Sequence, residues 1–202
     1  MTAFEEPEPH VRAKISTTVH AWAATFVTTS PFVVVASSGA DGYADASPRG
    51  GPPGFVRVLD DRTLAIPEEP GNRLVQTFRN LASHPAIGLL FLVPGMNETA
   101  RINGTAEVVR PGEPGWERFR TEWTHSDRLA AVTVVHVAEC YYHCGRASKF
   151  SGLWDVDRIL AHRQNPPLPR RPPRAATSAS DAVPVWNGTG HTPRCKRSEP
   201  RC

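Results

Sequence analysis

The chain is poor in cysteine and lacks any long hydrophobic run. Its four cysteines are scattered over 202 residues, which does not suit a disulfide framework and is typical of a reducing compartment. No segment approaches the roughly 18 apolar residues that a membrane-spanning helix requires. Residues 1–10 are acidic and contain prolines, unlike an apolar leader. These absences predict a cytoplasmic protein that does not enter a membrane.

Two further absences limit the chemistry that the protein itself can perform. The sequence shows neither a Ser-His-Asp set nor a spaced pair of carboxylates of the kind used in acid-base catalysis. We therefore assign no catalytic residue. Cys140, His143 and Cys144 lie close together in the sequence, but structural zinc normally takes two separated ligand pairs. In a strand the two cysteines would share a face and His143 would point away. We therefore expect no metal site.

Charge and proline content divide the chain into two parts. Residues 163–202 carry eight Lys or Arg against two acidic residues, a charge of +6, whereas residues 1–162 carry −3. The tail is rich in Pro, Arg, Ser and Thr without apolar periodicity, so we predict that it is disordered. Residues 1–162 are long enough for one domain with a full core. The basic tail lacks interleaved aromatic residues and a known binding motif, so a nucleic-acid partner is not expected.

The stretch from residue 45 to residue 80 is predicted to contain a hairpin followed by a helix. Residues 55–59 and 63–66 are β-branched and apolar runs joined by Asp-Asp-Arg, which is typical of an antiparallel hairpin. Apolar residues then follow helical spacing from residue 74 to residue 82, and Pro85 ends that helix. Residues 47–54 contain prolines and glycines that cannot continue a strand, so a loop or bulge is expected there.

The start of this helix has the features of an anion site. Asn72 can cap the helix, Gly71 admits a close ligand, and the free N–H groups of a first turn attract negative charge. Arg73 in that turn and Arg49 in the preceding proline-rich loop offer two guanidinium groups. A capped helix with a solvated arginine explains the same residues, so both interpretations stay open at this point.

Periodicity also predicts the elements outside this stretch. A helix is expected over about residues 9–28, and apolar runs typical of buried strands occur near residues 32–36, 86–93 and 132–144. The strand over residues 98–109 alternates, which places Arg101 and Asn103 on one face. That face is either exposed to solvent or contacts a ligand. Lys149 and Trp154, beyond the last strand, are either solvated or part of a cofactor site.

Seven short phrases occur in one order over roughly residues 8–160. They are Ser30-Pro31-Phe32, Ser47–Gly50, Pro53–Asp61, Gly71–Arg73, Gly88–Phe91, Arg101–Gly104 and Ser151–Asp157. Together they resemble the FMN-binding split barrels related to pyridoxamine 5'-phosphate oxidase, and most closely a bacterial branch of FMN-dependent enzymes. Several phrases in a fixed order are a more specific signal than any single short motif.

The resemblance implies a mainly β fold, a split β-barrel of about six antiparallel strands with peripheral helices, in a homodimer that binds FMN at the subunit interface. A two-fold partner would also supply concave surface that a barrel of this size lacks. The resemblance implies one set of residues around the ribityl phosphate: Arg49, Asn72, Arg73 and Lys149. It implies that backbone beneath the flavin ring comes from Val56, Arg57, Val58, Ile66 and Pro67. It implies that the substrate side is lined by Arg101, Asn103 and Trp154, with the first two contributed across the dimer.

The implied activity is an oxidoreductase in which FMN performs hydride or two-electron transfer on an unidentified small molecule, with NADH or NADPH as electron donor. The Arg-Leu-His-Asp-Arg phrase of true pyridoxamine phosphate oxidase is absent, and the nearest match is Leu153-Trp154-Asp155. This departure argues against vitamin B6 oxidation. Two alternatives stay open: a deazaflavin in place of FMN, and a haem-binding or flavin-storage module without turnover.

Overall fold

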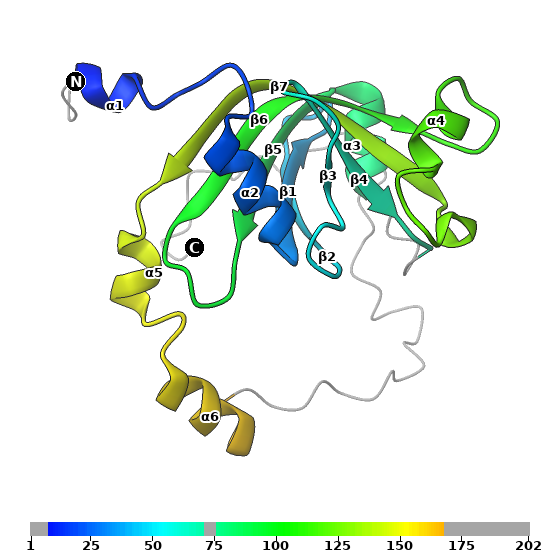
Figure 1. Cartoon of the computed structure of the whole chain (residues 1–202). Helices are drawn as coiled ribbons and strands as arrows, with labels where there is room; N and C mark the ends of the chain where they lie inside the picture. The colour runs from blue at the N-terminus through cyan, green and yellow to red at the C-terminus, as the bar shows by residue number, and fades with distance from the viewer. Residues whose placement is uncertain (1–7, 71–75, 168–202) are drawn as a thin grey trace, which may run out of the picture.

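Seven antiparallel strands form one curved sheet in the computed structural model, which describes residues 8–70 and 76–167 (Figure 1). The sheet order is β2-β1-β5-β6-β7-β4-β3. The strands are β1 (Phe32–Ser38), β2 (Ala44–Gly50), β3 (Arg57–Val58), β4 (Thr63–Glu68), β5 (Ala86–Leu92), β6 (Thr99–Val109) and β7 (Ala131–His143). The predicted mainly β split barrel is confirmed. Its sheet has seven strands rather than about six because the two-residue β3 forms an edge of its own.

The curled sheet stays open between its two edges. β2 is one edge and β3 is the other. The pairing of β3 with β4 covers only Arg57↔Ala65 and Val58↔Leu64, so the last residues of β4 have no strand neighbour on that side in the described part of the chain. We call this opening, bordered by β2, the end of β4 and helix α3 (Gln76–Ser83), the seam. The predicted hairpin and the predicted helix before Pro85 are thereby confirmed.

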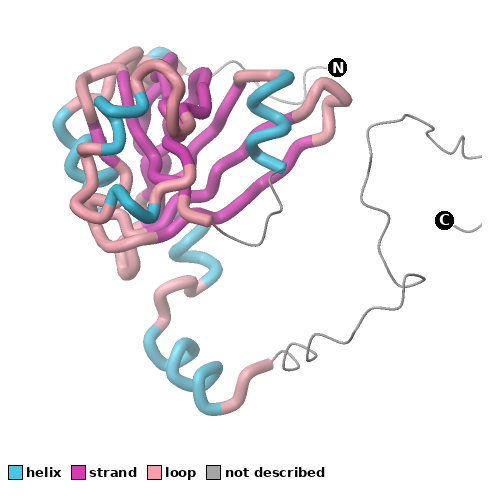
Figure 2. The backbone as a smooth tube through the Cα atoms, turned by 90° about the vertical axis from the view of Figure 1, so that its right-hand side faces the viewer, coloured by secondary structure: helices cyan, strands magenta, loops and turns pink. Residues whose placement is uncertain are grey.

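The helices lie around the sheet and beyond it. α2 (Ala21–Thr29) packs on β3, β6 and β7, α3 packs on β1, β2 and β6, and α4 (Trp116–Arg120) packs on β7. Both views show α5 (Arg146–Ser151) and α6 (Val156–Gln164) extending away from the body (Figures 1 and 2). The remaining helices are α1 (Pro9–Arg12) and the single-turn η1 (Ser126–Arg128). In the described ranges no helix is long and apolar enough to cross a membrane.

Apolar side chains form two clusters on opposite faces of the sheet. The larger fills the barrel interior and includes Leu64, Phe91 and Ile102. The smaller lies outside β4 and β7, where Trp116 and Val132 pack with the half-buried aromatic residues of the α4 region. The middle of β4 and residues 131–135 of β7 are buried on both faces, and these stretches are mainly apolar.

The prediction of one helix over residues 9–28 is wrong. α1 and α2 are separate, and between them the backbone of Ser16 forms a β-bridge with Cys140. Ser16 Oγ accepts the Thr18 N–H at 3.1 Å, and such local bonds, together with β-branched neighbours, disfavour helix. α2 begins after its N-cap residue His20, whose Nδ1 accepts the Ala23 N–H.

The prediction that a loop begins at Ser47 is also wrong. β2 continues to Gly50, and Pro48 pairs opposite Val34 of β1. Because β2 is an edge strand, it bonds to a neighbour on one side only, and proline is tolerated at such edges. The proline-rich loop is thus confined to residues 51–56, where Gly54 adopts a φ of 82°.

Candidate functional site

Arg49 spans the seam from the edge strand β2 to β4 and α3. Its Nε donates to Glu68 Oε2 at 2.9 Å, and its Nη2 donates to Thr77 Oγ1 at 3.4 Å. Its Nη1 donates to Ser47 Oγ at 2.6 Å and to the Pro48 carbonyl at 3.1 Å. Thr77 belongs to the first turn of α3, so the structure brings Arg49 to the start of the helix that was expected to bind an anion. Asn72 and Arg73, the other predicted members of that site, lie outside the described residues.

Glu68 is the buried partner of Arg49. Its side chain is 8% exposed and that of Arg49 is 20% exposed. The second carboxylate oxygen of Glu68 accepts the Thr133 hydroxyl at 3.0 Å. Burial raises the pKa of Glu68 above its ordinary value, while the positive charge of Arg49 and the Thr133 hydrogen bond oppose that rise. The seam therefore contains an ion pair that is largely withdrawn from water.

Polar bonds also fix α3 against the sheet. Asn80 Nδ2 donates to Ser37 Oγ of β1 at 3.0 Å, and Gln76 Nε2 donates to Asn80 Oδ1 at 2.9 Å. Asn80, Ser37 and Thr77 are all buried. Satisfied buried polar groups hold a helix in one position because each lost bond leaves a desolvated group unpaired. The start of α3 thus has a defined position relative to Arg49.

The residues predicted to lie under a flavin ring are mostly core residues. The side chains of Val56 and Ile66 are fully buried in the barrel interior, so only their backbone could face a ligand. Val58 is half-buried against the same core, and Pro67 is half-buried at the end of β4 beside the seam. Arg57 turns elsewhere, because its Nε donates to the Glu122 carbonyl at 3.0 Å.

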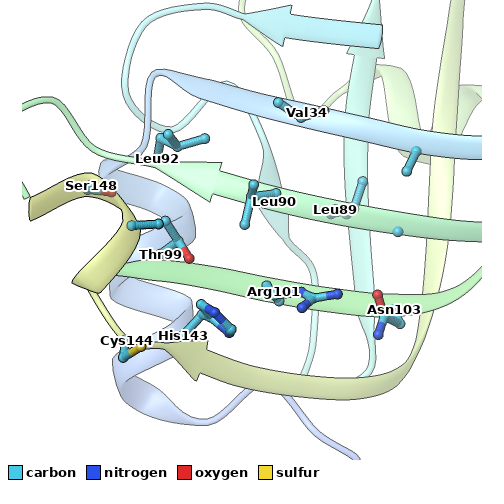
Figure 3. A pocket seen from close by; sticks show the side chains of 13 residues that line it. Val34, Leu89, Leu90, Leu92, Thr99, Arg101, Asn103, His143, Cys144 and Ser148 are labelled. Atoms are coloured by element: carbon cyan, nitrogen blue, oxygen red, sulfur yellow. The ribbon is translucent and has the colours of Figure 1, made fainter. Parts of the chain in front are cut away.

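A pocket of about 410 Å³ lies on the outer face of β1, β5 and β6, closed at one end by α5 (Figure 3). Strand pairing places Val34, Leu90 and Arg101 in one row across this face. Leu92 and Thr99 form the next row. The pocket is therefore mainly apolar on the β1 and β5 side and polar on the β6 side.

Arg101 is the charged group of this outer pocket. Its guanidinium lies 5.2 Å from the centre of the Tyr141 ring, and in the described part of the chain it has no hydrogen bond or ion pair. Asn103 Nδ2 donates to Glu139 Oε2 at 2.9 Å. A Cβ on Gly88 would lie 3.4 Å from Asn103 Oδ1, so this glycine leaves room above the strand. The pocket thus offers an uncompensated cation and an amide carbonyl to a ligand.

Sequence reasoning missed several residues of the outer pocket. His143, Cys144 and Ser148 line it, although none was assigned to a site. The expectation that Cys140 and Cys144 share a face is wrong, because β7 ends at His143 and the chain turns. Cys140 faces the core, where burial raises the pKa of its thiol. The sequence did contain one indication of this pocket, which is the polar residues that end the mainly apolar strand β7.

Lys149 and Trp154 lie with the outer pocket rather than with the seam. Lys149 is exposed on α5, next to the pocket residue Ser148. Trp154 Nε1 donates to the Met96 carbonyl at 2.7 Å, which ties the segment after α5 to the turn between β5 and β6. Lys149 was predicted to lie beside Arg49, which is on the other face of the sheet. Trp154 was predicted to lie on the substrate side with Arg101 and Asn103.

The seam and the outer pocket occupy opposite faces of one sheet. Arg49 pairs with Val33, whose side chain is fully buried in the barrel interior. Arg101 is in register with Leu90, and Leu90 with Val34. Because successive residues of a strand point to opposite faces, Arg49 and Arg101 of one chain face away from each other. A ligand bound to one face of the sheet therefore meets only one of these two arginines of the same chain.

Comparisons with known proteins agree with this architecture. The family model described as pyridoxamine 5'-phosphate oxidase matches residues 20–144, whereas no curated protein matches the chain. A variant of HupZ from Group A Streptococcus is 20% identical, with a TM-score of 0.50, over 62% of this chain and 99% of that one.

Two further solved structures are similar at lower scores. An FMN-binding protein from Syntrophomonas wolfei is 10% identical, with a TM-score of 0.43, over 60% of this chain and 82% of that one. A pyridoxamine 5'-phosphate oxidase-related, FMN-binding protein from Nostoc punctiforme is 8% identical, with a TM-score of 0.41, over 55% and 73%.

Proposed function

The chain belongs to the pyridoxamine 5'-phosphate oxidase family, and from this premise we propose that it is an oxidoreductase that holds FMN between two copies of itself. The seam of one copy takes the phosphate end of the cofactor. The outer pocket of the other copy covers the ring and admits a small-molecule substrate. The observation that carries this proposal is the placement of Arg49 and Arg101 on opposite faces of one sheet.

The seam suits the phosphate end. Arg49 is oriented by Ser47, Glu68 and Thr77, and a guanidinium fixed by several bonds loses little entropy when it binds an anion. The end of β4 beside it, from Ile66 to Glu68, has no strand on its open side in the described ranges. Its backbone is therefore available to a ribityl chain or a ring edge.

The outer pocket suits the ring of a flavin. Val34, Leu90 and Leu92 form an apolar surface for a flat aromatic system, and Arg101 stands at its polar end. A positive charge near the pyrimidine part of a flavin favours its reduced, anionic form. The Asn103 carbonyl oxygen and the His143 ring would then orient a small substrate against the ring.

A second copy of the chain accounts for the exposed apolar surface. Phe32 of β1 is 39% exposed, and its outward-facing neighbours Val34, Leu90 and Leu92 are only half-buried. Isologous contacts bury the same patch on both partners of a two-fold dimer. In such a dimer each site combines Arg49 of one chain with Arg101 of the other.

The chemistry follows from this arrangement. When bound, FMN would supply hydride or two-electron transfer, with NADH or NADPH of the cytoplasm as the donor. Arg49 would hold its phosphate, the apolar surface of the outer pocket would exclude water from its ring, and Arg101 would place a cation beside that ring.

Heterodimers of two broken variants test this proposal. Arg49→Gln and Arg101→Gln are co-expressed with different tags, and dimers that carry both tags are purified. If the arginines act across the interface, one site of the heterodimer is intact and the other lacks both arginines. We expect about one FMN per heterodimer, none in either homodimer and about two in the wild type.

Flavin absorbance after gel filtration gives these occupancies. A heterodimer as empty as the two homodimers would refute the shared site. A co-purifying cofactor with a deazaflavin or haem spectrum in the wild type would refute FMN itself.

A further inference from the structure

Almost every N–H of Arg49 is already used within the protein. Arginine has five donors. Nε is taken by Glu68, both Nη1 donors have acceptors in β2, and one Nη2 donor meets Thr77. Within the described residues, a single Nη2 donor has no partner. An incoming phosphate that engages Arg49 bidentately must therefore displace one of the present acceptors.

Glu68 is the acceptor that matters most to such a ligand. Ser47, Pro48 and Thr77 offer neutral oxygens, whereas Glu68 offers a carboxylate at 2.9 Å from Nε. A charged acceptor binds a guanidinium more strongly than a neutral one. The carboxylate also cancels the charge of Arg49, so the pair presents no net charge to an anion in a site that water screens poorly.

The position of Glu68 in β4 shows that this carboxylate is costly. Leu64, Ile66 and Glu68 alternate along the strand toward the barrel interior, and all three are buried. A buried ion pair is a weak source of stability because desolvation offsets the attraction. Linking β2 to β4 across the seam would need only a hydrogen-bond acceptor for Arg49 at this place. The negative charge of Glu68 would therefore act on ligand binding, by lowering the affinity of Arg49 for an anion.

We propose that Glu68 is an internal competitor for Arg49, occupying the guanidinium as a phosphate monoester would and thereby setting the affinity of the seam for that group. This inference rests on the proposed flavin site. A ligand phosphate gains Arg49 only by drawing it away from Glu68. Glu68 is thus a positioning and affinity-setting residue that acts through Arg49 without touching the reacting atoms.

The test compares FMN with riboflavin, which lacks the phosphate. Fluorescence titrations give the dissociation constants of both flavins for the wild type and for Glu68→Gln. The glutamine retains an acceptor for Arg49 and can donate to Thr133, but it carries no charge. We expect the preference for FMN over riboflavin to rise about tenfold in Glu68→Gln, with riboflavin affinity unchanged.

Two variants control for general effects of charge and folding. Glu117→Gln removes a carboxylate from an exposed pair with Arg120 on α4 and should leave the preference for FMN unchanged. Glu68→Asp keeps the charge but draws it back from Nε by one methylene. It should raise the preference in the same direction by a smaller factor, and it provides the measurement if Glu68→Gln does not fold.

A preference for FMN that is unchanged or reduced in the Glu68 variants would overturn the proposal, since a purely structural pair predicts no gain. If the wild type binds neither flavin, the proposed function fails separately. The inference is then decided by titrating inorganic phosphate and following the Arg49 Nε–H resonance by NMR. A shift at lower phosphate concentration in Glu68→Gln supports competition, and equal sensitivity in both proteins rejects it.

Discussion

The seam and the outer pocket present two arginines in opposite states. Arg49 is mostly buried, bonded to four acceptors and neutralised by Glu68. Arg101 is half-buried, rests on the Tyr141 ring and has no ion-pair partner in the described part of the chain. Arg49 is thus part of the bonding network of the folded chain, whereas Arg101 is available to a ligand or to a second copy of the chain.

This difference separates stability from assembly. A group that is bonded and buried contributes to the folded state of a single chain, so its loss should lower the free energy of unfolding. A group on an uncovered face contributes little until a partner arrives, so its loss should change association and leave folding intact. Variants on the two faces of the same sheet can therefore test the contrast.

The largest effect on folding is expected from Arg49→Met. This variant leaves Glu68 buried without its cation, which typically costs about 3 kcal/mol of unfolding free energy. The exposed pair of Arg120 with Glu117, at 2.6 Å, provides the matched control. Arg120→Met should cost under about 1 kcal/mol, because surface ion pairs contribute little.

Urea unfolding followed by circular dichroism measures both variants. Adding Glu68→Leu to Arg49→Met removes the stranded carboxylate and should recover much of the loss. Equal destabilisation by Arg49→Met and Arg120→Met would mean that the Arg49–Glu68 ion pair contributes no more than an exposed surface pair.

A smaller effect, on assembly, is expected from Leu90→Asp. Leu90 lies on the outer face between Val34 and Arg101, and loss of its burial in a dimer should cost about 2 kcal/mol of association free energy, or roughly a 30-fold weaker dimer. Thr105→Asp adds the same charge at an exposed position of β6 outside this apolar row and should leave association unchanged.

Sedimentation equilibrium gives the dimer constants of both variants, and their urea midpoints should stay close to the wild type. If Leu90→Asp unfolds the chain instead, the outer face belongs to the core of one protomer, and the contrast between the two faces fails.

Sequence periodicity predicted the elements of both regions but not their partners. The alternation of β6 correctly placed Arg101 and Asn103 on one face, and the switch from strand to helical spacing located α3. Periodicity also gave a signal for Glu68, which follows Leu64 and Ile66 at the spacing of an inward face. Its pairing with Arg49 joins residues 19 positions apart across the seam, and local patterns do not encode such contacts.

The wrong predictions have the same origin. Pro48 was expected to interrupt a strand, and only the sheet order shows that β2 is an edge where proline is tolerated. The helix expected through Ser16 is replaced by a bridge to Cys140, which lies more than a hundred residues away in the sequence. In both cases a tertiary neighbour decided the local structure.

The smallest expected effect is a pH dependence of stability that belongs to the seam. Burial raises the folded-state pKa of Glu68 above its ordinary value of 4.5, against the opposing charge of Arg49. As the pH rises, the carboxylate of the unfolded chain therefore loses its proton before that of the folded chain. The free energy of unfolding falls as the pH rises from 4.5 to the raised folded-state pKa, and it is constant at higher pH. Urea unfolding of wild type and Glu68→Gln over this range should show the wild type losing stability relative to the variant.

Glu139→Gln, which removes an exposed carboxylate beside Asn103 on the outer face, should follow the wild type throughout. Parallel curves for wild type and Glu68→Gln would show that the seam leaves the ionisation of its carboxylate unchanged, as an exposed surface would.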